Sequence, residues 1–173
     1  MSTDAANGPI RLVVPQGDRQ IEEVRRIFRD YARSLSVDLT FQSFEAELAE
    51  LPGPYESPQG GLLLAIVGNE VAGCGAFRRI TDVDYPNACE MKRLFVRPGF
   101  RRLGLGRRLA RELIDRATQA GYTTMLLDTL DEMETARELY VTLGFVEVPP
   151  YYYSPVPGAH YLCVDLGQVA SSY

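Results

Sequence analysis

The chain has 173 residues, of which 46% are hydrophobic and 24% are charged, and its formal net charge is -5. The length favours one domain with a sizeable core, and the acidic balance argues against a general nucleic-acid binder. No apolar run approaches the roughly 20 residues that cross a bilayer. Cys74, Cys89 and Cys163 lie far apart, which argues against a disulfide framework or a cysteine zinc site. We therefore expect a cytoplasmic protein with no metal, membrane or nucleic-acid partner.

The amino-terminal third of the chain predicts one strand and two helices. Residues 10–14 form a short apolar strand, and Asp18 stands where a helix N-cap is expected. Apolar residues then recur at helical spacing over 21–35 and, more briefly, over 43–51. Proline and glycine dominate residues 52–61, which predicts a loop before the next strand.

The remaining elements alternate between strands and helices. Asp131 and Glu134 have the spacing of a capping box at the start of the last helix. The predicted strands lie at 62–67, 71–79, 89–96, 123–128, 145–148 and 161–166, and the helices end near 120 and 143. This order, β-α-α-β-β-β-α-β-α-β-β, predicts one α/β domain with a mixed sheet over residues 10–167, between tails at 1–9 and 168–173.

A basic segment that contains two glycines is the strongest signal in the sequence. Eight basic residues and no acidic residue fall in the 21 positions from Met91 to Arg111. Gly104 and Gly106 lie among them, where the fourth predicted strand leads into a helix. Glycine lets backbone N–H groups approach a ligand closely, and the N-terminus of a helix favours an anion. The segment therefore predicts a binding site for a pyrophosphate.

Two other interpretations of this segment are less favoured. A dinucleotide-binding fold would place a third glycine at position 109, where this chain has Leu109, and would put the motif near the start of a domain. A helix cap without a ligand would leave eight unopposed cations without an explanation.

Three motifs fall on neighbouring predicted elements. They are Glu90-Met-Lys-Arg-Leu-Phe-Val96 in the fourth strand, Arg101-Arg-Leu-Gly104-Leu-Gly106 in the loop, and Ala136-Arg-Glu-Leu-Tyr140-Val-Thr-Leu-Gly144-Phe145 in the last helix. The loop resembles Q/R-x-x-G-x-G/A, the acetyl-CoA signature of the GNAT superfamily of N-acetyltransferases. The last motif resembles A-x-x-L-Y-x-x-x-G-F of the same family. The chain is therefore similar to this family from about Cys89 to Phe145.

The resemblance implies a fold and a cosubstrate. The fold is a single α/β domain whose mixed, mostly antiparallel sheet has about seven strands, flanked by about four helices, with the fourth and fifth strands splayed apart. The cosubstrate is acetyl-CoA, with its pyrophosphate on the glycine loop and its pantetheine arm along the fourth strand. The residues implied to bind it are Leu94, Phe95, Val96, Arg101, Arg102, Leu103, Gly104, Leu105, Gly106 and Arg107.

The resemblance also implies residues for acyl transfer to an amine. A primary amine with a pKa near 10 is only about 0.1% unprotonated at neutral pH, so it needs a base or a proton relay. Glu90 lies where many family members place that carboxylate, and Tyr140 lies where they place the acid that protonates the thiolate. Without the resemblance, Glu90 would be interpreted as a solvated strand residue and Tyr140 as an aromatic at the edge of the core.

The acceptor is the part of the function that the sequence specifies least. Lys92 and Arg93 occupy opposite faces of the predicted strand, so one of them, Arg93 in our assignment, is expected to line the acceptor site. Tyr55 and Tyr152 lie in loops expected beside that site, or they pack at a subunit contact. We expect the primary amine of a small molecule. A peptide N-terminus or lysine as acceptor, and a non-catalytic acyl-CoA-binding module, stay open, as does the choice between monomer and homodimer.

Overall fold

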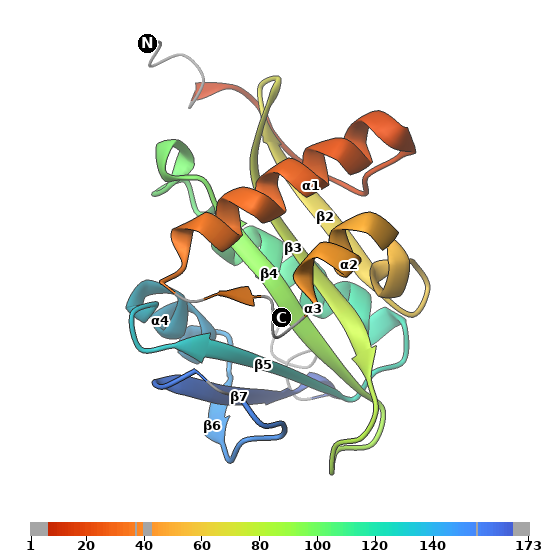
Figure 1. The fold of residues 1–173 in the computed structure, drawn as a ribbon, viewed down its shortest axis with the longest axis vertical. Coiled ribbons are helices and arrows are strands. Elements are labelled where there is room, and N and C mark those ends of the chain that lie inside the picture. The colour runs from red at the N-terminus through yellow and green to blue at the C-terminus, as the bar shows by residue number, and fades with distance from the viewer. Residues whose placement is uncertain (1–6, 37, 40–42, 155, 168–173) are drawn as a thin grey trace.

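Seven strands form one sheet at the centre of the fold (Figure 1). The computed structural model describes residues 7–36, 38–39, 43–154 and 156–167. Most of the two expected tails, at 1–6 and 168–173, lies outside the described residues, so the domain limits stay a prediction. The strands are β1 Ile10–Val13, β2 Gly61–Val67, β3 Glu70–Ile80, β4 Ala88–Val96, β5 Thr124–Leu130, β6 Val146–Val148 and β7 Ala159–Asp165.

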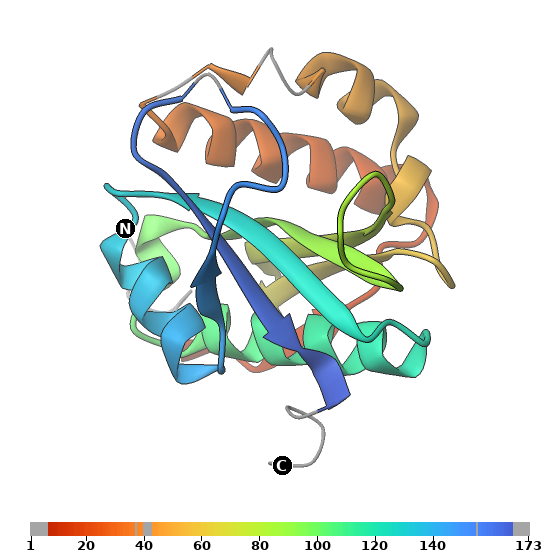
Figure 2. The same ribbon diagram turned by 90° about the horizontal axis from the view of Figure 1, so that it is seen from below.

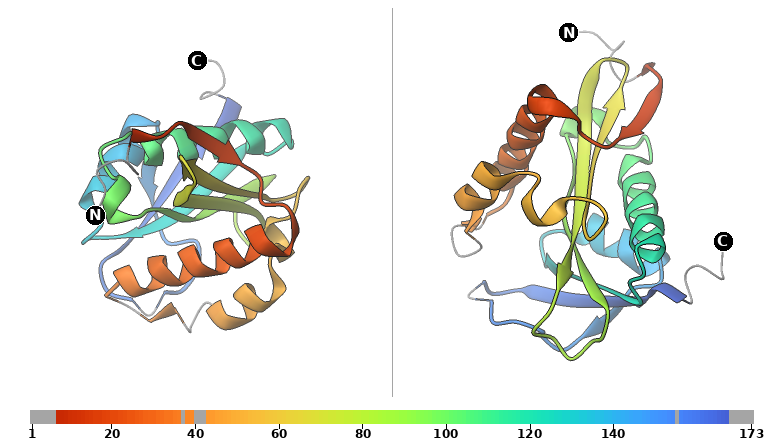
Figure 3. Two further views of the ribbon diagram at one scale, coloured as in Figure 1. Left: turned by 90° about the horizontal axis from the view of Figure 1, so that it is seen from above. Right: turned by 90° about the vertical axis from the view of Figure 1, so that its right-hand side faces the viewer.

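The strand order is β1-β2-β3-β4-β5-β7-β6, and every pair of neighbours is antiparallel except β4 and β5. Helices α1 (Gly17–Ser34) and α2 (Phe44–Glu50) cover one face of the sheet, and α3 (Leu105–Gln119) and α4 (Glu134–Thr142) cover the other (Figure 3). The predicted fold class, a mixed and mostly antiparallel sheet with four helices, is confirmed. Among the described residues, no helix is long and apolar enough to span a bilayer.

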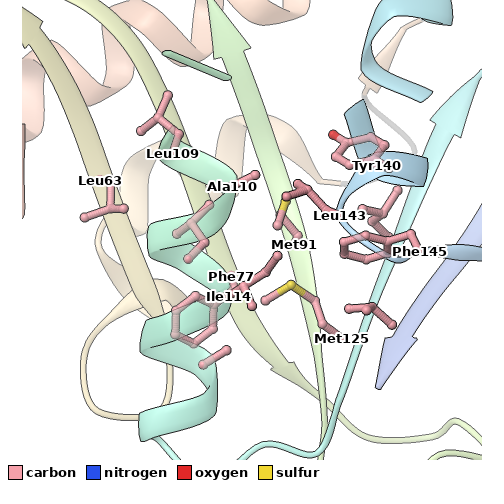
Figure 4. Packing of buried hydrophobic residues seen from close by; sticks show 14 of the residues in the cluster. Leu63, Phe77, Met91, Leu109, Ala110, Ile114, Met125, Tyr140, Leu143 and Phe145 are labelled. Carbon is pink, nitrogen blue, oxygen red and sulfur yellow. The ribbon is translucent and has the colours of Figure 1, made fainter. Parts of the chain in front are cut away.

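Each face of the sheet has its own hydrophobic core. Ile27 of α1 and Leu64 belong to the core on one face, and Leu109 of α3 and Leu63 belong to the core on the other, as the two-residue period of a strand requires. Both faces of β2 are buried, which explains why its sequence is a continuous apolar run. Figure 4 shows the α3 core extending to Tyr140, so α4 is anchored in the same core as the glycine-loop helix.

The two parallel strands separate after a short paired region. β4 and β5 pair only from Ala88 to Glu90 and from Thr124 to Leu126. Beyond these positions the two strands diverge across the sheet (Figure 1). The predicted splay of the fourth and fifth strands is therefore confirmed, and it opens the sheet near its centre.

A bulge in β4 changes which side chains share a face. The register with β3 shifts by one residue beside Arg93, which takes a left-handed backbone conformation with a φ of 61°. Lys92 and Arg93 consequently lie on the same side of the sheet, the side that α2 covers, where Lys92 approaches Glu90 and Arg93 pairs with Glu47. The prediction that these two cations face opposite sides is wrong, because it assumed an unbroken two-residue period.

Two predicted helix caps are not formed. The N-cap of α1 is Gln16, and Asp18 lies inside the first turn, where its charge still favours the helix dipole. The N-cap of α4 is Met133, and no side chain caps that helix. The Asp131 carboxylate instead contacts the His160 ring on β7. A partner distant in sequence thus replaces the local capping box.

Candidate active site

The glycine loop forms the N-terminus of α3. After a short 3-10 helix at Pro98–Phe100, Gly104 takes the N-cap position with a φ of 75°. The N–H groups in the first turn of α3 have no intrahelical partner, and no side chain caps them. Leu103 packs against the core and Leu105 is buried in it, which leaves the loop backbone at the surface. A Cβ on Gly104 would meet no atom within 4 Å, so the space beside this turn is open.

Four arginines surround this loop without a carboxylate partner among the described residues. Arg107 donates to the Thr142 hydroxyl on α4 at 2.8 Å, and Arg101 donates to the Val96 carbonyl at 3.3 Å. Uncapped backbone N–H groups, an open glycine and clustered cations fit the phosphates of coenzyme A. The arginines are Arg101, Arg102, Arg107 and Arg108.

Two other cations of the same segment are opposed by carboxylates from distant helices. Arg93 pairs with Glu47 of α2 at 2.9 Å, and Arg97 pairs with Asp30 of α1 at 2.9 Å. The sequence indicated eight unopposed cations, and this is wrong because both partners lie more than 40 residues away along the chain. These pairs attach α1 and α2 to β4 and its end.

A cavity of about 50 Å³, which we name the splay cavity, lies where β4 and β5 diverge. Both strands contribute to its walls, together with the end of α1, α4 and the described residues of the β6–β7 loop, 149–154 and 156–158, which approach the α1 side in Figure 2. The cavity is lined by Tyr31, Leu35, Leu39, Met91, Lys92, Arg93, Leu94, Leu127, Asp128, Thr129, Leu130, Met133, Tyr140, Ser154 and Val156.

The β4 segment expected to hold pantetheine, from Leu94 to Val96, lies beyond the region that pairs with β5. Leu94 lines the splay cavity, and Phe95 packs edge-on against Tyr31 with 5.8 Å between ring centroids. The β5-facing edge of this segment therefore has no strand partner among the described residues, and an extended ligand fits such an edge.

Tyr140 places its hydroxyl at the splay cavity. The ring packs edge-on against Phe145 with 5.6 Å between centroids, and the hydroxyl turns away from Phe145 toward β4 (Figure 4). The side chain is 6% exposed, and its hydroxyl makes no hydrogen bond to another described residue. Burial raises the pKa of Tyr140, so the phenol keeps its proton at neutral pH.

A second cavity, of about 440 Å³, lies on the α2 side of β3 and β4, and we name it the α2-side cavity. Lys92 lines both cavities, which places them side by side. Burial lowers the pKa of Lys92, and the nearby Glu90 opposes this change. The α2-side cavity is lined by Ser43, Ala46, Glu47, Glu50, Pro54, Tyr55, Arg78, Ile80, Glu90, Lys92, Tyr152 and Tyr153.

Glu90 lies in the wall of the α2-side cavity and is 2% exposed. Arg78 donates to Oε1 from Nε at 3.1 Å and from Nη2 at 2.9 Å, and the Tyr151 hydroxyl donates to Oε2 at 2.7 Å. Both carboxylate oxygens are therefore engaged. Glu90 does not line the splay cavity that holds Tyr140.

Asp128 is a residue of the candidate site to which the sequence patterns assigned no catalytic role. It lies on β5 in the splay cavity, and the Tyr152 hydroxyl donates to its Oδ2 at 2.5 Å. Burial raises the pKa of Asp128. The signal that marks it is a single carboxylate inside the apolar strand Thr124–Leu130. Tyr152 was predicted to line the acceptor site. It lines the α2-side cavity, and its hydroxyl bonds to Asp128, which lines the splay cavity.

The two other predicted acceptor residues are held by α2. Tyr55 is 1% exposed, packs edge-on against Phe28 and donates to Glu47 at 2.8 Å. Arg93 is buried, donates to both oxygens of Glu47 and lies over the Phe44 ring. Tyr55 lines the α2-side cavity and Arg93 lines the splay cavity, so each borders a space beside the site.

Known proteins share this sequence pattern and fold. Residues 21–145 match the model of the Acetyltransferase (GNAT) family. An uncharacterized N-acetyltransferase of Schizosaccharomyces pombe is 36% identical over 151 residues, covering 87% of this chain and 91% of the relative. A thialysine N-epsilon-acetyltransferase of Caenorhabditis elegans is 32% identical over 85 residues, covering 49% of this chain and 53% of the relative.

The same architecture occurs among solved structures. A GNAT-family acetyltransferase from Staphylococcus aureus Mu50 matches with a TM-score of 0.74 at 20% identity, covering 91% of this chain and 99% of that one. Its likeness supports the fold, while the family model and the yeast relative support the membership. The chain belongs to the GNAT family of acetyl-CoA-dependent N-acetyltransferases.

Proposed function

We propose that this enzyme transfers the acetyl group of acetyl-CoA directly to the primary amine of a small molecule. The position of Tyr140 carries the proposal. Its protonated hydroxyl faces the splay cavity, and its helix lies beside the N-terminus of α3. A proton donor, a phosphate-binding loop and an open strand edge thus meet at one place in the fold.

The binding residues proposed for acetyl-CoA follow from this arrangement. Backbone N–H groups from Arg102 to Arg107 hold the pyrophosphate, and the β4 edge at Leu94–Val96 orients the pantetheine arm. A Cβ added to Gly106 would lie 3.6 Å from Leu139 of α4, so the loop and the Tyr140 helix are in close contact. When bound, acetyl-CoA supplies the acetyl group and a thiolate leaving group.

Tyr140 is the proposed acid for that leaving group. A thiolate leaves faster when a nearby group gives it a proton, and a buried phenol is protonated across the physiological range. The absence of another partner for the hydroxyl among the described residues supports this role, because the proton is not committed elsewhere.

Direct transfer is supported by where the cysteines lie. Among the described residues that line the two cavities there is no cysteine. Cys74 and Cys89 are buried, and burial raises the pKa of both thiols, which leaves little thiolate to attack an acyl group. A covalent acyl-cysteine step is therefore not part of the proposal.

A small acceptor is supported by the shape of the site. The β6–β7 loop contributes Ser154 and Val156 to the splay cavity, and its Tyr152 lines the α2-side cavity together with Tyr55. These side chains border the acceptor region, and the small volume of the splay cavity, about 50 Å³, favours a small acceptor over a polypeptide. The name of the Caenorhabditis elegans relative also specifies a small amine.

The test is an acetyl-CoA turnover screen across amino acids, polyamines, other small amines and short peptides. We expect thiol release with at least one small primary amine and a much lower kcat/KM with peptides. A preference for peptide N-termini or lysines would replace the small-molecule acceptor. Acetyl-CoA binding by calorimetry without thiol release for any acceptor would indicate a binding module instead of an enzyme.

A further inference from the structure

We propose that Asp128, held by Tyr152, is the base that takes a proton from the acceptor amine, and that Glu90 is a positioning residue. The inference rests on the proposed acetyl transfer. Both carboxylates lie beside the point where β4 and β5 separate, but the surroundings of the two differ in access, in hydrogen bonding and in the cavity that they face.

Asp128 shares the splay cavity with Tyr140, the proposed acid. One of its oxygens, Oδ2, accepts the Tyr152 hydrogen bond, and the other, Oδ1, makes no hydrogen bond to another described residue. A base needs an oxygen with a lone pair that is available to the proton, within reach of the reacting nitrogen. The Asp128 carboxylate offers such an oxygen in the cavity that already contains the acid.

The Glu90 carboxylate is more heavily engaged and does not line the splay cavity. Its two oxygens accept three hydrogen bonds, two from Arg78 and one from Tyr151, and its side chain faces the α2-side cavity. The Glu90 contact with Tyr151 instead fixes the β6–β7 loop, and so holds the adjacent Tyr152 against Asp128.

The surroundings of Asp128 act on its pKa in both directions, and the net change is upward, which makes the carboxylate a stronger base. Burial raises its pKa; the Tyr152 hydrogen bond opposes that change, Glu90 reinforces it, and Lys92 and Arg93 oppose it. From the other elements around it, the phenols of Tyr31, Tyr140 and Tyr161 also face this carboxylate. These phenols carry no charge at neutral pH, so burial, the Tyr152 hydrogen bond and the β4 charges set the pKa of Asp128.

The proposed step conserves protons and electrons. Asp128 Oδ1 takes one proton from the ammonium, and the neutral nitrogen forms a C–N bond to the acetyl carbon. The C–S bond breaks with its electron pair on sulfur, and Tyr140 gives its proton to that sulfur. The nitrogen loses its second proton, which restores the Tyr140 phenol, and Asp128 releases the first proton to water. The net products are an N-acetylated amine, a free thiol and one proton.

The experiment compares Asp128→Asn with Glu90→Gln, using the panel amine that the wild-type enzyme acetylates fastest. Asparagine keeps the shape of Asp128 and a carbonyl oxygen for the Tyr152 bond. We expect Asp128→Asn to lower kcat at pH 7 by about 10²-fold or more while calorimetry shows unchanged affinity for acetyl-CoA. Its kcat should keep rising with pH and approach the wild-type value near the amine's own pKa, where no base is needed. Glu90→Gln should still show a fall in kcat at low pH, moved to lower pH because the Glu90 charge that helps to raise the pKa of Asp128 is gone.

An Asp128→Asn enzyme that keeps the wild-type kcat and acidic limb would overturn this inference and leave the proposed function intact. Loss of the acidic limb in Glu90→Gln alone would assign the base to Glu90. If the wild-type enzyme acetylates no amine, the proposed function fails, and this inference fails with it. Should Asp128→Asn not fold, Tyr152→Phe decides the question, since an unchanged acidic limb in that variant would contradict a base at Asp128.

Discussion

The Tyr152 hydroxyl donates a 2.5 Å hydrogen bond to the Asp128 carboxylate and thereby ties the β6–β7 loop to β5. The preceding residue, Tyr151, makes the corresponding bond to Glu90 on β4 at 2.7 Å. Two adjacent tyrosines thus engage one carboxylate on each of the two strands that splay apart. The arrangement allows each carboxylate to be probed by removing a single hydroxyl group.

Tyr152→Phe should shift the acidic limb of the kcat profile to higher pH. The Tyr152 hydrogen bond favours the charged form of Asp128 and so lowers its pKa against the effect of burial. Without that bond the pKa of Asp128 rises further, and more of the base is protonated at a given pH. The measurement is kcat from pH 5 to 10 with both substrates saturating.

Tyr151→Phe is the matched control for that shift. It removes a tyrosine hydroxyl from the same loop, but from the bond to Glu90. If Asp128 is the base, the acidic limb stays in place in this variant, although kcat falls modestly because the loop is less firmly held. A limb that moves in Tyr151→Phe and not in Tyr152→Phe would reverse the roles of the two carboxylates.

Gly104→Ala should weaken acetyl-CoA binding. Gly104 has a φ of 75° at the N-terminus of α3, and an alanine there costs about 1–2 kcal/mol in backbone strain and places a methyl group beside the proposed pyrophosphate site. We expect the KM for acetyl-CoA to rise about tenfold or more, with a smaller change in kcat. Initial rates across acetyl-CoA concentrations measure both constants.

Gly121→Ala tests whether that effect is specific. Gly121 follows the opposite end of the same helix with a φ of 99°, and a Cβ there also meets nothing within 4 Å. The two variants should lose similar stability in urea unfolding, while the KM for acetyl-CoA changes only in Gly104→Ala. Equal KM values in both variants would remove the glycine loop from the binding site.

Arg93→Ala should destabilise the fold by about 3–5 kcal/mol, because it leaves the largely buried Glu47 carboxylate without its partner. The control is Arg116→Ala, which removes a pair with the same 2.9 Å N–O distance to Glu112 but on an exposed helix face. That change should cost less than about 1 kcal/mol. Urea unfolding of both variants measures the difference, and similar losses would mean that burial of the Arg93 pair contributes nothing.

Tyr140→Phe should lower kcat by about 10²-fold or more without weakening acetyl-CoA binding, because it removes only the proposed proton donor. The phenylalanine ring keeps the edge-on packing against Phe145, so the melting temperature should stay close to that of the wild type. Tyr122→Phe, which removes a hydroxyl bonded to the Gln59 carbonyl outside both cavities, is the matched control. An unchanged kcat in Tyr140→Phe would exclude Tyr140 from the mechanism.

Local sequence patterns predicted the elements of this fold well. The two-residue and 3.6-residue periods marked the strands and helices, because burial on a sheet face or a helix stripe is a local property. Boundaries moved by only a few residues, as at β7, which begins at Ala159 and not at Tyr161. The glycine loop could also be predicted, because a positive φ, as at Gly104, strongly favours glycine at that position.

The site was harder to predict where distant residues decide the outcome. The bulge at Arg93 depends on the register with β3, and the partners of Arg93 and Arg97 come from α2 and α1. Asp128 stood out as the one carboxylate in an apolar strand. Its place in the site, however, depends on the splay of β4 from β5 and on the position of Tyr152. Such relationships arise from tertiary packing, so no spacing rule within one segment reports them.

The most direct test of direct acetyl transfer is mass spectrometry of a panel amine incubated with the enzyme and acetyl-CoA, with thiol release followed in parallel. The proposed mechanism predicts one acetyl group on the amine nitrogen for each thiol released, at a rate proportional to enzyme concentration and greatly reduced in Tyr140→Phe. Thiol release without an acetylated amine, or an acetyl group trapped on the protein in place of the amine, would contradict it.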